Sequence, residues 1–600
     1  MDVDSENTWT TPEGELVADF AYRRNEISYG PTGRVRVQPR QHDYRFKTQL
    51  RPQKTGLMLV GWGGNNGSTI TGEWAILANK LGLSWETKRG LQKADYFGSI
   101  TQSSTVHIGF DGERQVYVPF KDVLPMVEPN ELVIDGWDIN SVNLYQAMKR
   151  ARVFEPELQR QLRVHMEHLV PKPSVYYPDF IASNQEDRAN HVLNGTKKEH
   201  LETIRRDIRQ FKELHDLECV IIMWTANTER QAQVKKGLNV TATDLLESID
   251  KNRAEVAPSH IFGVAAALEG CHFINGSPQN SLVPGLVELA HEHLVFVAGD
   301  DFKSGQTKLK SVLVDYLVQS GLKPESIVSY NHLGNNDGKN LNEERQFRSK
   351  EITKSSVVDD VVASNRLLYP TGRKPDHCIV IKYVPFVGDS KRAMDEYTTS
   401  IFMGGLNTMV IHNTCEDSLL AAPLILDLAI IMELCTRDGL ALGTRGMHSL
   451  IVQVHPHRIQ YSAKEADEFC SFHPVLSLLS CLLKAPVVPE GTPVCNGLMR
   501  QLTTLTKLLT VCAGIGSDHD LQLEFFTQLP PAVPETNVSH GATSATAETM
   551  ANGHDQPTKP LQMNGHDQPT KLLQMNGHHE PLANGVVTNG YHRLPNPLPS

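Results

Sequence analysis

The sequence predicts an α/β protein built on a doubly wound, largely parallel β-sheet. Short apolar runs alternate with stretches of helical periodicity, as they do when helices join the strands of a sheet. Several of these runs are continuously apolar, which is typical of strands covered by helices on both faces. The expected strands are 56–60, 131–137, 219–224, 293–299, 326–331 and 377–384, and the expected helices include 140–151, 199–216 and 305–320.

Composition supports a large packed core and argues against nucleic acid as a partner. The 600 residues are 40% hydrophobic and 21% charged. At about 100–200 residues per domain, this length corresponds to about three to five domain-sized units, or fewer large ones. The 58 Lys and Arg against 69 Asp and Glu give a net charge of −11. An acidic chain lacks the phosphate-neutralising surface that sequence-independent nucleic-acid binding needs, so a cluster of lysines is informative.

Cysteine usage and hydropathy favour a cytoplasmic protein. The nine cysteines are widely spaced and form no CxxC pair, so we expect no disulfide framework and no metal site. Residues 1–15 lack the apolar stretch of a signal peptide. The longest apolar region, 419–435, contains Asp427 and Glu433 and is shorter than the about 20 uncharged residues of a membrane span. It therefore predicts a buried helix and no membrane insertion.

The last part of the chain, 530–600, differs in composition from the rest. It is rich in Pro, Asn, Gly, His, Thr and Gln, and 551–562 is repeated almost unchanged at 563–574. Its apolar residues are too sparse to offset the conformational entropy that folding would cost. We expect a disordered, low-complexity tail.

A glycine-rich loop at 57–70 predicts a dinucleotide site. An apolar strand runs into the loop and a helix-like stretch follows, so small residues let the backbone approach a pyrophosphate at a helix N-terminus. The glycines are Gly61, Gly63, Gly64 and Gly67. Their spacing is one residue longer than the common dinucleotide fingerprint, and no Gly-Lys-Ser/Thr follows, so this is not a P-loop. An acidic partner for the adenosine ribose could be Glu86 or Asp135, and spacing does not choose between them.

Cations gather beside flexible polar loops in the second half of the chain. Lys350 and Lys354 are four residues apart and would share one face of a helix. The other cations are Lys303, Lys308, Lys391 and Arg392, and the acidic residues beside them are Asp301, Asp337 and Asp389. In an acidic protein this clustering predicts an anion site, most simply for a phosphate. Buried lysines can also move protons or stabilise an enolate.

Long motifs in these regions resemble the eukaryotic inositol-3-phosphate synthase (myo-inositol-1-phosphate synthase) family. The resemblance covers about residues 15–525. The motifs are GWGGNNGST, DGWDI, WTANTER, NGSPQN, GDDFKSGQTK, SYNHLGNNDG, QFRSKEITKSSVVDD, DHCIVIKYVPFVGDSKRAMDEY and HNTCEDSLLAAPLILDL.

The resemblance implies a Rossmann-like NAD-binding domain with an inserted α+β domain that closes the site and builds a homotetramer. It implies an isomerase of inositol and phospholipid biosynthesis that converts D-glucose 6-phosphate to 1D-myo-inositol 3-phosphate by NAD-dependent oxidation, enolisation, aldol cyclisation and reduction. We expect an N-terminal segment at 1–45, an NAD-binding domain at 46–306, a catalytic and tetramerisation domain at 307–430, a return to the NAD-binding domain at 431–529, and the tail at 530–600.

The resemblance also implies roles for individual residues. The catalytic set is Lys350, Lys354, Lys391, Lys484, Asp301, Asp337, Asp389 and Asp427, with Lys350 as the base that removes the C6 proton. The cofactor set is Gly63, Gly64, Asn65, Asn66, Asp135, Gln185, Arg188, Thr225, Ala226, Asn227, Thr228, Gly276, Ser277, Ser304, Asn335, Asn336, Asp337, Lys350, Gly388, Asp389, Asp417 and Ser418. Family likeness favours Asp135 over Glu86 at the ribose.

Two departures from the family pattern bear on activity. Residues 438–458 are inserted where the family is shorter, and the helix after the glycine loop holds about two extra residues, which would rotate its continuation by about 200°. A surface loop would tolerate the insertion, since loop-closure entropy grows slowly with length. Two alternatives therefore stay open: a net NAD-dependent sugar-phosphate dehydrogenase, and a catalytically impaired isoform that binds NAD and joins or modulates tetramers.

Overall fold

The computed structural model describes residues 4–72, 77–88, 90–436, 459–463 and 469–516. By its internal contacts the chain divides into two units, Met1–Leu521 and Gln522–Ser600. The insertion at 438–458 and the tail at 530–600 lie outside the described residues. Helix α1 (Asn65–Gly72) and helix α2 (Leu77–Leu81) stand on either side of 73–76, so the extra residues expected after the glycine loop also fall outside them.

A six-stranded parallel sheet forms the centre of the first unit. Its spatial order is β10 (Lys172–Pro173), β9 (Val133–Asp138), β4 (Thr55–Val60), β11 (Cys219–Trp224), β12 (His272–Asn275) and β13 (Val297–Ala298). All neighbouring pairs are parallel. Numbered along the chain, this is the 3-2-1-4-5-6 order of a doubly wound dinucleotide-binding sheet. The predicted fold class is confirmed.

The strand expected at 293–299 is much shorter than its apolar run. Helix α9 (Pro284–Glu292) ends immediately before it, and Leu294 turns the chain with a positive φ of 55°. Only Val297–Ala298 remain to pair with β12.

Alternate residues of the central strands feed two cores on opposite faces of the sheet. Leu57 and Leu59 of β4 belong to one core, and Met58 and Val60 belong to the other. The first core contains α4 (Leu144–Ala151), α5 (Pro156–Met166) and α14 (Asp417–Leu434). The second contains α6 (Lys197–His215), α7 (Ala242–Asp250), α8 (Pro258–Leu268) and α9. Two-sided burial explains why these strands read as continuous apolar runs.

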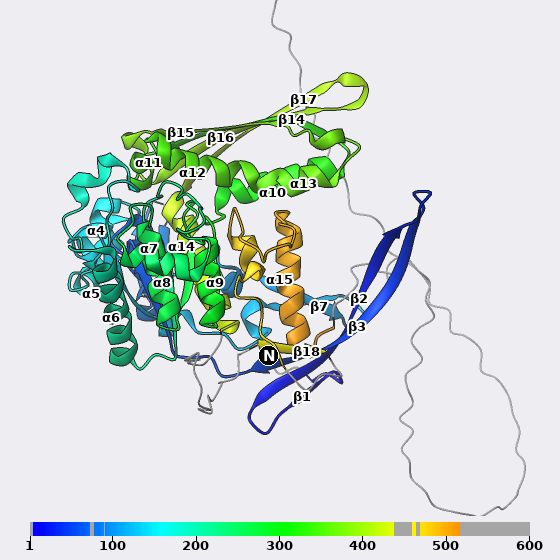
Figure 1. Ribbon diagram of the computed structural model, residues 1–600, viewed down its shortest axis with the longest axis horizontal. Coiled ribbons are helices and arrows are strands. Elements are labelled where there is room, and N and C mark those ends of the chain that lie inside the picture. Colours follow the sequence, from blue (N-terminus) through cyan, green and yellow to red (C-terminus); the bar gives the residue numbers. More distant parts are fainter. Residues whose placement is uncertain (1–3, 73–76, 89, 437–458, 464–468, 517–600) are drawn as a thin grey trace, which may run out of the picture. The chain divides into compact units, whose positions relative to one another are not determined.

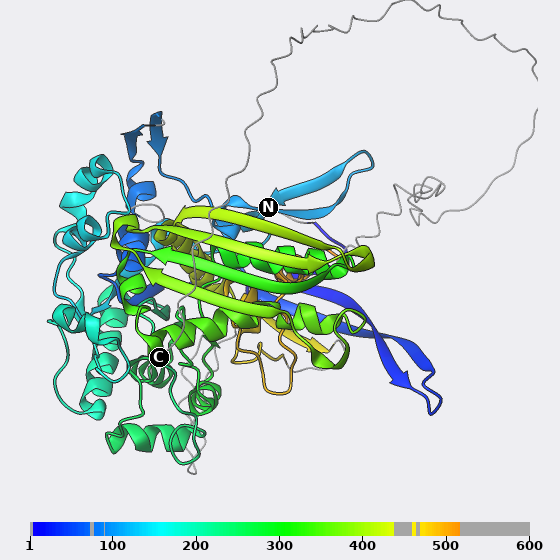
Figure 2. The same cartoon turned by 90° about the horizontal axis from the view of Figure 1, so that it is seen from above.

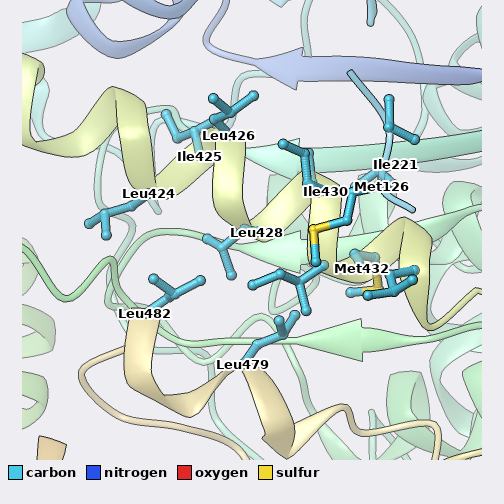
Figure 3. Packing of buried hydrophobic residues seen from close by; sticks show 14 of the residues in the cluster. Met126, Ile221, Leu424, Ile425, Leu426, Leu428, Ile430, Met432, Leu479 and Leu482 are labelled. Carbon is cyan, nitrogen blue, oxygen red and sulfur yellow. The ribbon is translucent and has the colours of Figure 1, made fainter. Parts of the chain in front are cut away.

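The apolar region at 419–435 forms most of α14, as predicted. Residues Leu424–Leu434 are buried on all sides of this helix. Figure 3 shows its side chains packed between Ile221 of the sheet and Leu479 and Leu482 of a later segment. Among the helices that the structure describes, none is long and apolar enough to cross a membrane.

A second, four-stranded sheet is inserted between β13 and α14. Its order is β15 (Asp376–Tyr383), β14 (Lys323–Leu333), β16 (Ser390–Ser400) and β17 (Leu406–Glu416). One face packs on α10 (Gly305–Gln319), α12 (Glu344–Ser355) and α13 (Asp359–Ser364), which lie below the strands in Figure 1. Figure 2 looks onto the other face, with the strands in front of those helices. Sequence patterns predicted β14 and β15 but not β16 and β17, whose alternate side chains are exposed and mostly polar.

A third, antiparallel sheet pairs strands near the N-terminus with a strand from the later part of the chain. It contains β1 (Thr8–Thr10), β2 (Glu15–Tyr29), β3 (Val35–Gln49) and β18 (Ile459–Ala463), with Ile459 opposite Thr48. Helix α15 (Leu498–Cys512) packs against this sheet. The remaining elements are two hairpins, β5–β6 (Ser84–Thr87, Gly90–Lys93) and β7–β8 (Thr105–Phe110, Gln115–Pro119), and the short helices α3 (Ile100–Ser103) and α11 (Asn336–Asn340). The domain boundaries given above remain predictions.

Candidate active site

A cleft lies at the carboxyl ends of the parallel strands, beside β4 and β11. These two strands are neighbours in the sheet, and the chain leaves them toward opposite edges of it. It holds about 1190 Å³ of space that protein atoms do not fill. Open α/β sheets bind ligands at this topological switch point. The loops after the strands supply one side of the cleft, and residues from α11, α12 and β16 of the inserted segment supply the other.

The glycine loop lies directly against the loop that follows β11. Gly61 has a φ of 90°, and a Cβ there would lie 2.6 Å from Ala226 Cα. The loop is fixed by hydrogen bonds from Gly61 N to the Trp137 carbonyl (2.8 Å) and from Gly64 N to the Gly61 carbonyl (2.9 Å). Helix α1 begins at Asn65, so its free N–H groups and positive dipole end face the cleft, where an anionic pyrophosphate would be stabilised.

Besides Trp224 Nε1, three buried polar atoms at or beside the cleft have no hydrogen-bond partner among the described residues. They are Arg188 Nε, Asn227 Nδ2 and Gln185 Oε1. Arg188 and Asn227 line the cleft, and Gln185 lies in the same short 3-10 helix as Arg188. Burying such groups unpaired is costly, which indicates a polar ligand at this position. Together with the glycine loop, they fit a dinucleotide.

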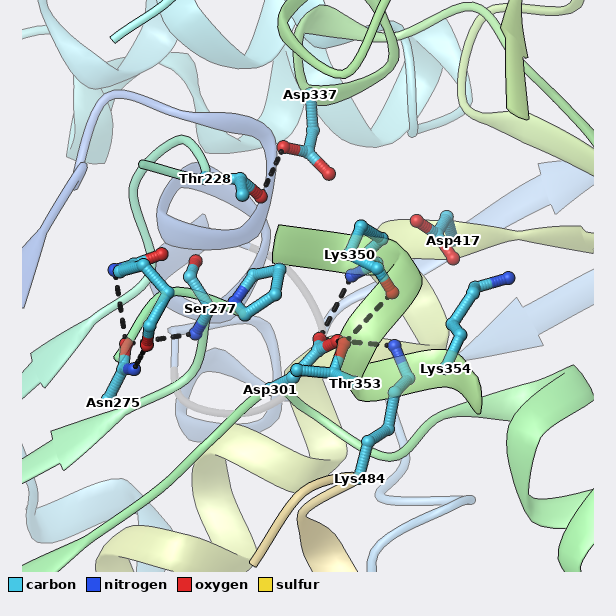
Figure 4. A network of polar contacts seen from close by, with 12 residues as sticks. Thr228, Asn275, Ser277, Asp301, Asp337, Lys350, Thr353, Lys354, Asp417 and Lys484 are labelled. Carbon is cyan, nitrogen blue, oxygen red and sulfur yellow. Dashed lines mark hydrogen bonds and ion pairs between the residues drawn. The ribbon is translucent and has the colours of Figure 1, made fainter. Parts of the chain in front are cut away.

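One carboxylate, Asp301, pairs with two lysines. Asp301 Oδ1 accepts from Lys350 Nζ (2.9 Å) and Lys484 Nζ (3.1 Å), and Oδ2 accepts from Thr353 Oγ1 (2.7 Å). Figure 4 shows both lysines converging on this carboxylate. Burial would raise the pKa of Asp301, but the two ammonium groups outweigh it and lower the pKa to about 2. Asp301 is therefore ionised at neutral pH.

The pKa values of the two lysines that share Asp301 are shifted in opposite directions. Burial opposes the charge on Lys350, but Asp301 and Asp337 outweigh it and raise the pKa of Lys350 above its ordinary value. Burial of Lys484 lowers its pKa to about 7, although Asp301 acts in the other direction. A permanently charged lysine and a lysine that titrates near neutrality thus lie side by side.

The other two site lysines have different partners. Lys391 Nζ donates to Asp417 Oδ1 (2.9 Å), and burial is outweighed by this carboxylate, so the pKa of Lys391 is raised. Lys354 Nζ donates to two amide oxygens, Gln306 Oε1 (3.2 Å) and Asn331 Oδ1 (3.0 Å). Burial lowers the pKa of Lys354 well below its ordinary value, and nearby lysines lower it further.

Comparisons with known proteins agree with this geometry. The family model described as myo-inositol-1-phosphate synthase matches residues 55–510. The chain belongs to this family. It is 53% identical over 516 residues to inositol-3-phosphate synthase 1 of Oryza sativa subsp. japonica, covering 86% of this chain and 97% of the relative. It is 55% identical over 509 residues to inositol-3-phosphate synthase 1-B of Xenopus laevis, covering 85% and 86%. The crystal structure of inositol-3-phosphate synthase from Caenorhabditis elegans matches with a TM-score of 0.83 and 60% identity, over 89% of this chain and 100% of that one.

Most residues that the family resemblance suggested lie on the wall of this cleft. They are Gly64, Asn65, Asn66, Arg188, Thr225, Ala226, Asn227, Thr228, Gly276, Ser277, Asp301, Ser304, Asn335, Asn336, Asp337, Lys350, Lys391, Asp417 and Lys484. Lys350 and Lys354 lie on one face of α12, as their spacing predicted. The roles of these residues are taken up as proposals below.

Asp389 joins three segments of the site instead of lining the cleft. Its carboxylate accepts from Asn65 Nδ2 (3.1 Å), Asn335 Nδ2 (3.0 Å) and both the backbone N–H (2.8 Å) and hydroxyl (2.9 Å) of Ser418. Gly388, beside it, accepts from Gly334 N (2.9 Å). These contacts tie the glycine loop, the start of α11 and the start of α14 to one carboxyl group.

Asp427, which the resemblance assigns to the catalytic set, is not among the residues that line the cleft. Asp427 follows Asp417 by ten positions on α14, which is about 15 Å along a helix. Its carboxylate accepts from the backbone and hydroxyls at the start of α3, at Ser99 Oγ (2.6 Å), Ile100 N (2.7 Å) and Thr101 N (3.0 Å). Asp427 therefore caps α3, and the acidic residue that α14 brings to the cleft is Asp417.

Asp135, which the resemblance assigns to the cofactor, is also not among the residues that line the cleft. Asp135 lies in the middle of β9, where it pairs with Lys172, and Glu86 is exposed in the β5–β6 hairpin. The strand continues to Asp138, which is 4% exposed and lines the cleft. Family likeness favoured Asp135, and Asp138 was not among the candidates. The motif DGWDI contains both residues.

Sequence reasoning missed several other residues of the cleft. Ser174, Val175 and Tyr176 line it, although they follow a strand of only two residues that has no apolar pattern. Lys303, by contrast, lies away from the cleft and donates to the Asn496 carbonyl (3.1 Å) and Gln501 Oε1 (2.9 Å). Among the described residues, no group of three or more His, Cys, Asp or Glu side chains could hold a metal ion.

The shared carboxylate predicts a specific stability difference between neighbouring variants. Asp301→Asn leaves two buried ammonium groups without their counter-charge, so we expect it to lower the free energy of unfolding by about 3–5 kcal/mol. Asp300→Asn is the matched control. Burial raises the pKa of Asp300 well above its ordinary value, so the folded protein disfavours its charged form, and Asp300→Asn removes no ion pair with Lys350 or Lys484. We expect a cost under about 1 kcal/mol. Urea unfolding at pH 7 measures both, and equal costs would contradict the pairing.

Proposed function

We propose that this chain is an NAD-dependent isomerase that converts D-glucose 6-phosphate to 1D-myo-inositol 3-phosphate, the first committed step of inositol biosynthesis. The observation that carries the proposal is the pair Lys350 and Lys484 on Asp301, at the edge of a dinucleotide cleft in a chain of this family. Bound NAD supplies a hydride acceptor and donor, so the overall conversion is redox-neutral. The residues of the chain must then bind the sugar phosphate, move protons and stabilise charge.

The cofactor would be held along the glycine loop and the loops after β9, β11 and β12. The start of α1, with Gly63, Gly64, Asn65 and Asn66, would hold the pyrophosphate. Asp138 takes the place of Asp135 beside the adenosine ribose, since it lies at the end of the second strand, where an acidic residue usually meets the ribose hydroxyls. Arg188, Asn227 and Gln185 offer their unpaired buried atoms to the same ligand.

The substrate phosphate would lie between Lys391 and Lys354. Lys391 carries its charge beside Asp417, and Lys354 has no carboxylate contact among the described residues. A phosphate dianion would supply the negative charge that Lys354 lacks, which favours the protonated lysine. Asp337, which accepts from Thr228 Oγ1 (3.4 Å), stands on the cofactor side of Lys350.

Lys484 is a better candidate than Lys350 for the base that removes the C6 proton. Lys350 is held protonated by Asp301 and Asp337, and a charged ammonium cannot accept a proton. It can instead stabilise the oxygen of an enolate. The lowered pKa of Lys484 provides a neutral amine near pH 7, which general-base catalysis requires.

The same proposal includes a homotetramer in the cytoplasm. The outer face of the inserted sheet exposes Tyr330, Met394 and Val410, which would be buried by another copy. All nine cysteines are free, as is usual in a reducing compartment. Light scattering would test the assembly and cell fractionation the location.

A product assay tests the activity. With glucose 6-phosphate and a catalytic amount of NAD, we expect inositol phosphate to accumulate without net NADH, because hydride is returned to the substrate carbon skeleton. Chromatography of the product and absorbance at the NADH band measure the two quantities. Steady NADH accumulation would instead indicate a dehydrogenase, and NAD binding without product would indicate an impaired isoform.

The reassignment of the ribose carboxylate predicts a contrast between two variants on the same strand. Asp138→Asn removes the charge that meets the ribose hydroxyls, and we expect the Kd for NAD to rise about tenfold, equivalent to about 1.4 kcal/mol. Asp135 does not line the cleft, so Asp135→Asn should change this Kd by less than about twofold. Isothermal titration calorimetry measures both, and the reverse order of effects would restore Asp135.

The low pKa of Lys484 predicts that turnover increases as the pH rises through neutrality. Its folded-state pKa is about 7, lowered from 10.5, so the neutral amine becomes more abundant as pH rises through 7. We expect kcat to rise from pH 6 to pH 8 and then level off. Lys484→Arg stays charged over this range, so its residual activity should lack the rise. A wild-type profile that rises only near pH 10 would contradict the assignment.

A further inference from the structure

Lys354 differs from the other three site lysines in what surrounds its ammonium group. Lys350, Lys484 and Lys391 each contact a carboxylate. Among the described residues, Lys354 has only neutral acceptors, the side-chain amides of Gln306 and Asn331. It is 3% exposed, so water does not readily replace these contacts. The direction of the Lys354 Nζ–H bonds therefore depends on which way the two amides point.

A primary amide can present either its oxygen or its nitrogen, and only the oxygen can accept from an ammonium group. Gln306 Nε2 donates to Asp395 Oδ1, a carboxyl oxygen that accepts hydrogen bonds. This contact turns the nitrogen of Gln306 toward Asp395 and leaves its oxygen toward Lys354. Asp395 is 3% exposed, and its second oxygen accepts from Tyr397 Oη (3.1 Å).

Asn331 is oriented by the same rule. Its Nδ2 donates to the backbone carbonyl of Val380 (3.2 Å), which is acceptor-only, so Asn331 Oδ1 faces Lys354. Asn331 is on β14 and Val380 is on β15. The inserted sheet thus sets the polarity of both amides that contact Lys354.

We propose that Asp395 is a positioning residue for the substrate-phosphate site, because it holds the Gln306 amide with its oxygen toward Lys354. This inference deepens the proposed function and rests on its placement of the phosphate at Lys354. Asp395 and Lys391 lie four residues apart on β16 and therefore point to the same face of the sheet. Strand β16 therefore supplies both Lys391 of the phosphate site and Asp395, the carboxylate that orients the Gln306 amide beside Lys354.

The charges around Lys354 explain why the orientation of the Gln306 amide matters. Lys310 and Lys391 add like charge beside Lys354, and Lys484 adds it when protonated. Lys310 contacts Ser329 Oγ (2.7 Å) and His377 Nε2 (2.9 Å), and burial lowers the pKa of His377 to about 3. Burial also lowers the pKa of Lys310 to about 8, and the charge of Asp395 opposes this shift. A flipped Gln306 would aim N–H groups at an ammonium in this cationic region. Asp395 prevents that arrangement and keeps the remaining Lys354 N–H available to an anion.

The decisive variant is Asp395→Asn, which keeps the shape but can now donate to Gln306 Oε1 and permit the flipped amide. With NAD present, we expect its Kd for inorganic phosphate and its KM for glucose 6-phosphate to rise at least tenfold. The Kd for NAD should change less than twofold. Tyr397→Phe is the matched control, because it removes the other hydrogen bond to Asp395 and leaves the carboxylate, so all three constants should stay within about twofold.

A double-mutant cycle separates positioning from general stability. Gln306→Met removes the amide, and we expect a similar loss of phosphate affinity. The double variant Asp395→Asn, Gln306→Met should be no weaker than Gln306→Met alone, because Asp395 acts through Gln306. Fully additive losses, or unchanged phosphate affinity in a folded Asp395→Asn, would overturn the proposal.

Two further outcomes are decided in advance. If thermal melting shows that Asp395→Asn does not fold, Gln306→Met decides alone, and unchanged phosphate affinity overturns the proposal. Calorimetric phosphate binding needs no turnover. If the wild type and the variants bind phosphate with the predicted order of affinities but the wild type makes no inositol phosphate, the proposed function fails. The positioning role of Asp395 then still stands.

Discussion

The chemistry of the site depends on one buried ion-pair group, the carboxylate of Asp301 with Lys350 and Lys484. One carboxylate is shared by Lys350, which stays charged, and Lys484, whose pKa is about 7. Buried charges are tolerated only when they are paired and hydrogen-bonded, and here Thr353 supplies the remaining donor. The unequal sharing of Asp301 gives the two lysines different protonation states. Chemically identical side chains are thereby divided into a charge stabiliser and a proton acceptor.

A second carboxylate, Asp389, gives the site its shape. It collects donors from the glycine loop, from the start of α11 and from the start of α14, which are far apart in the chain, at Asn65, Asn335 and Ser418. The cofactor side and the substrate side of the cleft are therefore mechanically linked. The doubly wound sheet supplies the floor, and the inserted sheet supplies Lys391 and the residues that orient Lys354. Neither layer contains a complete site.

The sequence predicted the elements that form continuous apolar runs and missed those whose apolar residues are sparse. Strands β4 and β11 are buried along their whole length and helix α14 over Leu424–Leu434, so their apolar runs were unambiguous. Strands β16 and β17 have one exposed face, and β10 is two residues long, so hydropathy did not reveal them. The choice of Asp135 over Glu86 for the ribose came from family likeness, and spacing along the sequence did not point to Asp138.

The sequence by itself determined the fold class, the glycine loop, the family and most residues on the cleft wall, because local periodicity and long contiguous motifs encode them. The tertiary structure alone decided the partners of those residues. That Lys484 shares Asp301 with Lys350, that Asp427 caps a distant turn, and that Asp395 acts on Lys354 through Gln306 are contacts between residues far apart in the chain. Electrostatic and hydrogen-bonding roles are set by distance and burial, and spacing along a chain specifies neither.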